Sequence, residues 1–355
     1  MKSFFQMTCL RIGLIADVQY ADIDDVWNYM RTHKRKYRST LKALANAINW
    51  WSTIEDMDLV VDLGDAIDGF RNVDRDMGLR ALENVMQEWK ILENKHVRLP
   101  IIHLIGNHEL YKFTRDELMN GVGATGFKCI PPASIHSKVD LPQSTYYTFP
   151  LRDGWRVVVL DPYDVSVMRN GGGRIGHELT LANGGIHAEY AALCQSHNPN
   201  NLLDGGDFFK GISGIDSRWV PFNGGVGKDQ LKWLNSVLQS ATHNKERVIV
   251  FTHIVLHPLA TPKHDGHTLL WNYDEVLGIF AANSCVRIVV AGHAHHEGYH
   301  ECPETRIHHI TMASPLEAPD EVAESTFGLL ELPDGQGTTA RLIGRGWMSS
   351  LELKV

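Results

Sequence analysis

Long hydrophobic runs are missing from this sequence of 355 residues. No stretch approaches the roughly 18 consecutive apolar residues that a membrane-spanning helix requires. The opening residues 1–7 are also too short, and too interrupted by polar side chains, to form the apolar region of a signal peptide. We therefore expect a soluble protein that stays in the cytoplasm and does not contact membranes.

Cysteine is sparse, and no Cys-x-x-Cys pair occurs. The five cysteines are scattered along the chain: Cys9, Cys129, Cys194, Cys285 and Cys302. An odd number at these spacings is unlike a disulfide framework or a zinc ribbon. Reduced thiols in a cytoplasmic protein fit the pattern better.

An excess of positive charge is the third missing feature. Asp and Glu together number 42 against 34 Lys and Arg, which gives a formal net charge of −8. A general nucleic-acid binder, or a protein that binds anionic membranes, needs a basic face. We expect neither partner. A small phosphate-containing substrate is compatible with this charge, because bound divalent cations would dominate the local field.

The sequence does contain the material for a large core and many possible metal ligands. Hydrophobic residues make up 43% of the chain and charged residues 21%, as is usual for a globular protein of this size. Nineteen histidines are a high count, and several lie close to predicted strand ends. This placement invites a metal-binding interpretation.

One strand end is the most informative place in the sequence. The apolar run at residues 101–105 predicts a buried strand, which Gly106 ends. Asn107, His108 and Glu109 follow directly, at the carboxyl end of that strand. Open α/β sheets place their ligand sites at this end of their strands.

The same pattern occurs after four other apolar runs. The runs and the polar residues that follow them are 10–16 with Asp17 and Gln19, 59–63 with Asp65 and Asp68, 248–251 with His253, and 286–291 with His293 and His295. A single polar residue after a strand means little, because every strand ends in a loop. Five strand ends that deliver carboxylates, amides and imidazoles predict a shared metal site.

These residue types suit a centre that holds two divalent ions. Aspartate can bridge two ions because its two oxygens are hard, anionic and close together, and imidazoles and amides complete the coordination without adding charge. Two ions about 3.5–4 Å apart can generate a hydroxide near neutral pH and clamp a phosphoryl group. Asp65, central in the series, is the predicted bridge.

The spacing of apolar residues predicts alternating strands and helices. The first half is expected to hold strands at 10–16, 58–63 and 101–105 with helices at 38–53, 74–95 and 114–119. Such repeats are typical of a largely parallel sheet covered by helices. The second half is expected to hold strands at 145–149, 155–160, 247–252 and 286–291 with helices at 225–240 and 268–282. The last strands, at 307–312, 327–332 and 339–344, are expected to form a second, antiparallel sheet.

Residues 162–226 differ from the rest because they are rich in Gly, Asn and Asp and show no sustained period. We interpret them as an insertion near the active site of a single domain that spans residues 1–355. Ordered loops of this length are usually functional. The aromatic residues of the insertion are consistent with a lid over the substrate and equally with packing: Phe208, Phe209, Trp219 and Phe222.

Taken in order, the motifs resemble those of the calcineurin-like metallophosphoesterase superfamily. They are Asp17-x-Gln19, Gly64-Asp65-x-x-Asp68, Gly106-Asn107-His108-Glu109, Thr252-His253 and Gly292-His293-Ala294-His295. The resemblance covers residues 10–296 and implies an α/β fold of two mixed β-sheets flanked by helices, a four-layer sandwich with a dinuclear centre at the strand ends.

The resemblance also implies a role for each residue. One metal would be held by Asp17, Gln19, Asp65 and His295, and the other by Asp65, Asn107, His253 and His293. His108 would contact the phosphate and protonate the leaving oxygen. Asp68 would be hydrogen-bonded to His108, which fixes the ring and favours its charged form.

Gln19 departs from the family pattern, which has histidine at this position. An amide oxygen makes the site harder, so we expect Mn²⁺ or Mg²⁺ rather than Zn²⁺ there. The alternative is that Gln19 is no ligand at all. Asp-x-Gln, the chain length and the Gly-rich insertion resemble the manganese-dependent ADP-ribose/CDP-alcohol diphosphatases, which implies two divalent ions, with Mn²⁺ for activity and Mg²⁺, Zn²⁺ or Fe as alternatives.

The resemblance implies that a metal-activated hydroxide cleaves the pyrophosphate bond of ADP-ribose or of a CDP-alcohol such as CDP-choline. The products would be a nucleoside monophosphate and a phosphorylated sugar or alcohol. Two alternatives stay open. The same centre could act as a phosphomonoesterase on proteins or nucleotides, or the chain could be a non-catalytic scaffold, which should lack ligands or His108. A monomer is the default expectation.

No substrate-binding residue is predicted with a specific role. Several residues near the motifs are expected to be structural or solvated: Tyr20, Tyr29, Arg35, Arg38, His103, Asp161 and His296. Asp161 precedes a proline and is expected to start a turn. His296 is expected to face away from His295, because neighbouring residues of an extended segment point in opposite directions.

Overall fold

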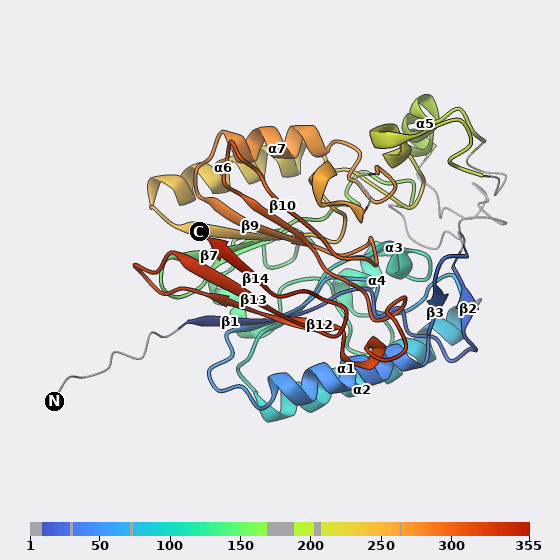
Figure 1. Cartoon of the computed structure of the whole chain (residues 1–355), viewed down its shortest axis with the longest axis horizontal. Helices are drawn as coiled ribbons and strands as arrows, with labels where there is room; N and C mark the ends of the chain where they lie inside the picture. The colour runs from blue at the N-terminus through green and yellow to red at the C-terminus, as the bar shows by residue number, and fades with distance from the viewer. Residues whose placement is uncertain (1–8, 29–30, 72–73, 169–187, 202–206, 263–264) are drawn as a thin grey trace.

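A computed structural model describes residues 9–28, 31–71, 74–168, 188–201, 207–262 and 265–355. Two six-stranded sheets form its centre (Figure 1). The first sheet has the order β14-β13-β12-β1-β4-β5 and the second the order β10-β11-β9-β8-β7-β6. Both are mixed, as the family resemblance implies.

The first sheet joins strands from the two ends of the chain. Its strands are β1 (Leu10–Ile15), β4 (Leu59–Asp62), β5 (Ile101–His103), β12 (Phe327–Leu332), β13 (Thr339–Arg345) and β14 (Leu351–Lys354). β1, β4 and β5 run parallel, whereas β12 pairs antiparallel with β1 and is followed by β13 and β14 in a meander.

The second sheet is built from the middle of the chain. Its strands are β6 (Tyr147–Pro150), β7 (Trp155–Val159), β8 (Arg247–Phe251), β9 (Val286–Ala291), β10 (Gly298–Glu301) and β11 (His308–Thr311). The four inner strands β7, β8, β9 and β11 are parallel, and the edge strands β6 and β10 are antiparallel to their neighbours.

The expectation that the last strands form a separate antiparallel sheet is wrong. β11 pairs parallel with β9, and β12 and β13 extend the first sheet beside β1. β12 is buried at five of its six positions, because one face meets the other sheet and the opposite face meets α1. Because its side chains are mostly apolar on both faces, β12 is better suited to a sheet covered on both sides than to a separate sheet at the surface.

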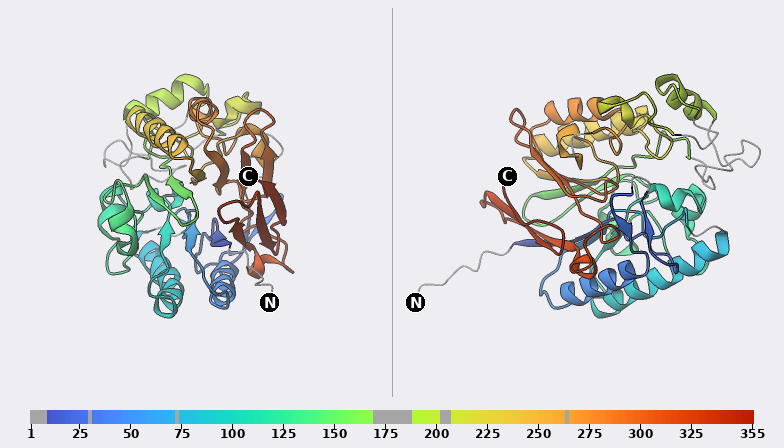
Figure 2. Two further views of the ribbon diagram at one scale, coloured as in Figure 1. Left: turned by 90° about the vertical axis from the view of Figure 1, so that its left-hand side faces the viewer. Right: turned by 45° about the vertical axis from the view of Figure 1, so that its right-hand side comes forward.

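Helices cover the outer face of each sheet, which gives four layers (Figures 1 and 2). α1 (Ser39–Trp51) and α2 (Arg75–Lys95) lie on the first sheet, and α6 (Lys228–His243) and α7 (Tyr273–Ala281) lie on the second. Short helices α3 (Asn107–Leu110), α4 (Arg115–Asn120) and α5 (Ala188–His197) complete the helical part. None of the helices in the described ranges is long and apolar enough to cross a membrane.

Alternation along the strands separates two apolar layers. Leu14 and Val61 of the first sheet meet Ile249 and Val290 of the second in a buried cluster between the sheets. Neighbouring residues of the same strands, such as Val60, face the covering helices. The strands that precede the predicted ligands, β1, β4, β5, β8 and β9, are buried on both faces near their carboxyl ends, which fixes the position of the loops that follow.

The insertion at 162–226 is only partly covered by the described residues. Its glycine runs at 171–173, 184–185 and 205–206 lie outside them. Its last part returns to the body of the protein, where Val165 bridges Gly225 in antiparallel fashion. Asn223, in this last part, is completely buried.

Candidate metal centre

The two sheets place the predicted ligands at one seam. Asp17, Asp65 and Asn107 follow β1, β4 and β5 of the first sheet, and His253, His293 and His295 follow β8 and β9 of the second. We call these six residues and Gln19 the ligand cluster. Hydrogen bonds join the two sheets at this seam. His253 Nδ1 lies 2.7 Å from the carbonyl oxygen of Leu63, and the His293 backbone amide donates to the Asp17 carboxylate.

Asp65 lies at the middle of the ligand cluster. Its Oδ2 is 3.4 Å from His253 Nε2 and 3.0 Å from the side-chain amide nitrogen of Gln19, and its Oδ1 accepts a 2.8 Å hydrogen bond from the His108 amide. One ligand atom each of Asp65, His253 and His293 lies within 4.8 Å of the other two. This position suits the predicted bridging role.

Gln19 faces the other half of the cluster. Its side-chain nitrogen lies 2.9 Å from His295 Nε2, while its buried Oε1 has no hydrogen-bond partner. The two ends of an amide have nearly the same shape, so turning it would place the oxygen beside both Asp65 and His295. An oxygen, a carboxylate and an imidazole nitrogen about 3 Å apart are the donor set of a divalent cation. The residues therefore fit a metal.

Hydrogen bonds fix which nitrogen each imidazole offers. His253 donates from Nδ1 to the Leu63 carbonyl, and its buried Nε2 makes no hydrogen bond. His293 Nε2 lies 2.7 Å from Asn223 Oδ1, which leaves Nδ1 for the cluster. The Asn223 amide group donates to two backbone carbonyls, so its oxygen must face His293.

Asn107 is held by two tyrosines. Its side-chain nitrogen donates to the Tyr111 hydroxyl at 2.9 Å, and its oxygen accepts from the Tyr163 hydroxyl at 3.1 Å. One lone pair of this oxygen is still available, because a carbonyl oxygen accepts two hydrogen bonds.

Backbone strain is concentrated at the ligands. Five of the seven have a positive φ: Asp17, Gln19, Asp65, His293 and His295. Residues with a Cβ adopt this conformation rarely, and the surrounding structure must enforce it. Gly64 also has a positive φ, of 98°, and a Cβ on Gly106 would collide with the Asp65 carboxylate. The sharp turns that follow the strands thus depend on these glycines.

Opposite charges are balanced inside the buried cluster. Burial raises the pKa of Asp17 above its usual value, although His253 and His295 oppose this effect. Burial would also raise the pKa of Asp65, but His253 and His108 outweigh it and lower the pKa. Burial would lower the pKa of His253, whereas Asp65 raises it to about 9. The carboxylates therefore require nearby positive charge, which divalent ions supply when bound.

His108 borders the cluster from α3. Its Nδ1 accepts a 3.1 Å hydrogen bond from the Gly69 amide and lies 3.5 Å from Asp68 Oδ1, while its Nε2 is 3.9 Å from Asp65 Oδ2. Burial would lower the pKa of His108, but Asp65 and Asp68 outweigh it and raise the pKa. With Gly69 on Nδ1, the proton of the neutral ring resides on Nε2.

Three important residues carry no signal in the sequence that identifies their role. Glu109 accepts hydrogen bonds from the backbone amides of Asp65, Ala66 and Gly106, and so ties two strand ends together. Asn223 orients His293 from the end of the insertion. In the sequence, Glu109 stands out because it follows the Asn107-His108 pair, but Asn223 and Glu317 lie in segments without a recognisable motif.

Glu317 is the third of these residues. It lies in the loop after β11, and its Oε1 is 3.0 Å from His295 Nδ1 and accepts from Arg35 Nε at 2.8 Å. The expectation that Arg35 is solvated is therefore wrong, and its side chain is only 28% exposed. A carboxylate behind a metal-binding imidazole fixes the tautomer and raises the basicity of the ring.

The remaining expectations concern residues near the motifs. His103 is a core histidine as expected, with Nδ1 3.0 Å from Asp62 Oδ2. Tyr20 is buried and packs in the core. Tyr29 lies outside the described residues.

The aromatic residues of the insertion divide into two groups. The centres of the Phe222 and His293 rings are 6.0 Å apart, so Phe222 borders the ligand cluster, and the Phe209 ring lies next to Phe222 at 6.2 Å. Trp219 instead stacks on His197 and Trp271, which packs the insertion against the body of the protein.

Two mixed sheets flanked by helices, with carboxylates and imidazoles gathered at the strand ends, define a metal-dependent phosphoesterase. The chain belongs to the calcineurin-like phosphoesterase family, and the family model matches residues 10–297.

The chain is similar along nearly its whole length to proteins named manganese-dependent ADP-ribose/CDP-alcohol diphosphatase. It is 34% identical to the protein of this name from Oryza sativa subsp. japonica, over 96% of the chain and 92% of the relative. The identity to the Danio rerio protein is 36%, over 86% of the chain and 88% of the relative. A crystal structure of a dimetal phosphatase from Danio rerio is 32% identical, with a TM-score of 0.77 and coverage of 97% and 98%.

Proposed function

We propose that the chain hydrolyses the pyrophosphate bond of ADP-ribose and of CDP-alcohols in a manganese-dependent reaction. The products would be a nucleoside monophosphate and a phosphorylated sugar or alcohol. The observation that carries the proposal is that relatives of near-equal length bear this name. The metal-type donor atoms that lie together at the seam between the sheets support it.

Seven side chains would hold two ions. Asp17, Gln19, Asp65 and His295 would bind one, and Asp65, Asn107, His253 and His293 the other. When bound, divalent ions supply a nucleophilic hydroxide near neutral pH and positive charge for the phosphoryl oxygens. The Gln19 amide favours Mn²⁺ or Mg²⁺ over Zn²⁺ or Fe at the first position, because amide oxygens are hard ligands.

We assign proton transfer to His108. The Gly69 amide occupies Nδ1 and thereby keeps the proton of the neutral ring on Nε2, the nitrogen that faces Asp65. Against the effect of burial, Asp65 and Asp68 raise the pKa of His108 and so favour the charged ring, which can pass its Nε2 proton to a leaving phosphate oxygen and return to the neutral form. Asp68, 3.5 Å from Nδ1, holds the orientation of the ring, and two backbone amides hold Asp68 in turn.

The insertion would contribute the wall for the organic part of the substrate. Phe222 borders the ligand cluster on the side of His293, Phe209 lies next to it, and both are only partly buried. Partly exposed aromatic rings of this kind offer a surface on which a base can stack. We propose this role for the described end of the insertion.

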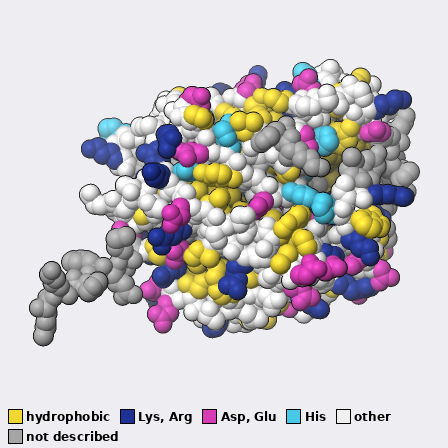
Figure 3. All heavy atoms as spheres, in the orientation of Figure 1, with side chains coloured by type: hydrophobic (Ala, Val, Ile, Leu, Met, Phe, Trp, Pro, Cys, Tyr) yellow, Lys and Arg dark blue, Asp and Glu magenta, His cyan; other side chains and the backbone are white. Residues whose placement is uncertain are grey.

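We also propose that the protein works in the cytoplasm on small nucleotides and needs no partner. All five cysteines are unpaired, which suits a reducing compartment. Figure 3 shows positive and negative side chains interspersed over the visible face, with no continuous basic tract among the described residues there. One chain supplies every proposed ligand, so a monomer suffices.

The test is product analysis with metal-stripped protein. ADP-ribose or CDP-choline is supplied, and Mn²⁺, Mg²⁺ or Zn²⁺ is added back. We expect AMP or CMP with Mn²⁺, and a loss of turnover of about 10²–10⁴-fold in His108→Ala with unchanged manganese content. Turnover of a simple phosphomonoester without cleavage of either nucleotide would overturn the substrate assignment, and full turnover by His108→Ala would overturn the role of that residue.

A further inference from the structure

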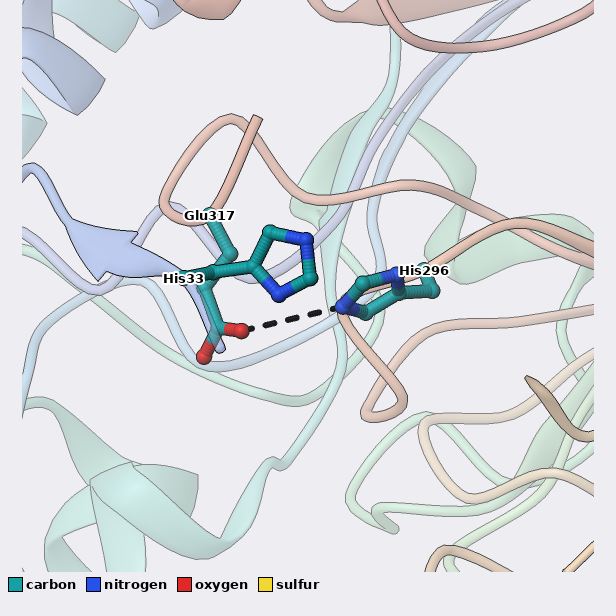
Figure 4. Close-up of side chains that lie close together, drawn as sticks. All are labelled: His33, His296 and Glu317. Carbon is teal, nitrogen blue, oxygen red and sulfur yellow. Dashed lines mark ion pairs between the residues drawn. The ribbon is translucent and has the colours of Figure 1, made fainter. Parts of the chain in front are cut away.

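A second group of metal-type side chains lies outside the ligand cluster. It consists of His33, His296 and Glu317, which we call the rim cluster (Figure 4). One ligand atom of each residue lies within 4.8 Å of the other two. His33 precedes β3 (Lys34–Arg35) in the small hairpin with β2 (Val26–Trp27), and the other two residues lie in the loops after β9 and β11.

The distances suit ligands of one ion better than a direct hydrogen bond. Glu317 Oε2 and His296 Nε2 are 3.7 Å apart, which exceeds a hydrogen-bond distance. Two ligands about 2.0–2.1 Å from a tetrahedral ion are about 3.3 Å apart. The His33 and His296 rings lie edge to face with their centres 4.6 Å apart, so both imidazoles line the same space.

Glu317 has a lone pair to spare for an ion. Its Oε1 is taken by His295 and Arg35, and its Oε2 accepts one hydrogen bond from Asn28 at 2.9 Å. A carboxylate has about four acceptor positions. The fourth is on Oε2, the oxygen that faces His296.

The surroundings would shield an ion without closing the site. The Trp347 ring lies 4.7 Å from the His296 ring and 5.8 Å from the His33 ring, and covers one side. The Glu317 side chain is 4% exposed, whereas that of His296 is 31% exposed. A metal can thus enter from solvent and keep a water as a further ligand.

We propose that His33, His296 and Glu317 form a third divalent-metal site that binds ions of the zinc class. Two imidazoles and one carboxylate are a known donor set for Zn²⁺, with water in the fourth position. The proposal does not depend on the proposed reaction, because it concerns the binding of metal in the absence of substrate.

The rim cluster shares one residue, Glu317, with the surroundings of the ligand cluster. The same Glu317 carboxylate accepts from His295 Nδ1 with one oxygen and would bind the third ion with the other. For this reason Glu317 is unsuited to a clean test. The two histidines are only partly buried and can be replaced with little effect on the core.

The test counts zinc on the full-length protein. Metal-stripped protein is dialysed against Zn²⁺, and bound metal is measured by mass spectrometry for wild type and for His33→Ala/His296→Ala. We expect the double variant to bind one equivalent less. A matched control, His136→Ala/His243→Ala, removes two imidazoles elsewhere and should bind as much zinc as wild type. Circular dichroism verifies that each variant is folded.

Asp65→Asn separates the two sites. This change should reduce the zinc bound at the ligand cluster and leave one equivalent of zinc at the rim cluster. In wild type, anomalous diffraction from zinc-soaked crystals should show a peak among His33, His296 and Glu317. Equal zinc content in wild type and the rim double variant, or no anomalous peak at the rim, would overturn the proposal. If the protein did not hydrolyse the nucleotides, the expected zinc content and the expected anomalous peak at the rim cluster would be unchanged.

Discussion

At the scale of single residues, side chains behind the imidazoles decide which nitrogen each ring presents. Asn223 performs this task for His293 and Glu317 performs it for His295. For this task neither residue needs to touch an ion of the dinuclear centre or a substrate. Each accepts a hydrogen bond from the N–H on the far nitrogen, which keeps the near nitrogen deprotonated and fixed in direction.

Replacing Asn223 by alanine should weaken manganese binding by about 10–100-fold, the usual cost of losing an orienting partner of a metal-binding histidine. The measurement is a Mn²⁺ titration in which binding is monitored by calorimetry and activity by nucleotide turnover. Asn46→Ala is a matched control, because Asn46 is an exposed amide that donates to the Glu324 carbonyl far from the cluster. Equal manganese affinity in Asn223→Ala and wild type would contradict the orienting role.

Residues of this kind mark the limit of what the sequence reveals. Asp17, Asp65 and His253 were predictable because each lies within two residues of the end of an apolar run, so that local pattern and position in the sheet coincide. Asn223 reaches its histidine across 70 positions of sequence and Glu317 across 22. A contact of that range depends on how loops fold over the finished sheets, and no local spacing encodes it.

At the scale of elements, a buried ion pair holds α4 against the end of β7. Arg115 contacts both carboxylate oxygens of Asp161, at 2.6 and 3.0 Å, and Thr145 donates to the same carboxylate at 2.6 Å. Asp161 also accepts from the Tyr163 amide, as expected of a residue that starts a turn. The turn was predictable from the proline that follows, whereas the arginine was not.

Arg115→Met should destabilise the fold by about 3–5 kcal/mol at neutral pH, because it leaves Asp161 buried without a partner. Burial alone would raise the pKa of Asp161, but Arg115 and Thr145 hold it below its usual value. The stabilisation is therefore fully present above the carboxyl pKa of the unfolded chain, about 3.9, and is lost as pH falls through the lower folded pKa.

Urea denaturation of wild type and Arg115→Met at a series of pH values checks this prediction. The difference in free energy of unfolding should narrow as pH falls from about 6 to about 3, because protonation removes the favourable pair in wild type and the buried charge in the variant. A difference that stays constant over this range would show that the lost stability comes from packing alone.

The prediction of elements from the sequence was better for helices and central strands than for the tail. α1 and α2 show apolar residues at helical spacing, and the structure confirms both. The tail strands were assigned to the wrong sheet, because alternation shows that a segment is a strand but not which strand it joins. β12 pairs with β1, more than 300 positions earlier, and only the complete fold brings them together.

At the scale of the whole molecule, we expect a single domain with metal-dependent stability. Both sheets contribute to the ligand cluster and to the apolar layer between them, so neither sheet has a complete core of its own. Divalent ions bound at the ligand cluster would therefore link the stability of the two halves. Ions that bind only the folded state stabilise it by about 2.7 kcal/mol at a concentration 100 times their dissociation constant.

Scanning calorimetry with and without a chelator measures this link. We expect one transition in both conditions and a higher midpoint with Mn²⁺. Asp65→Asn should show no such rise with Mn²⁺, since it lacks the proposed bridging ligand. Two separate transitions would contradict the single-domain interpretation, and an equal rise in Asp65→Asn would place the stabilising manganese elsewhere.

The division of the ligand cluster between two sheets also affects how the protein is made. A ribosome releases Asp17, Asp65 and Asn107 well before His253, His293 and His295. A nascent chain therefore carries an incomplete donor set until the second sheet has formed beside the first. Products of translation that are truncated before His293 would lack part of the donor set and should bind fewer ions.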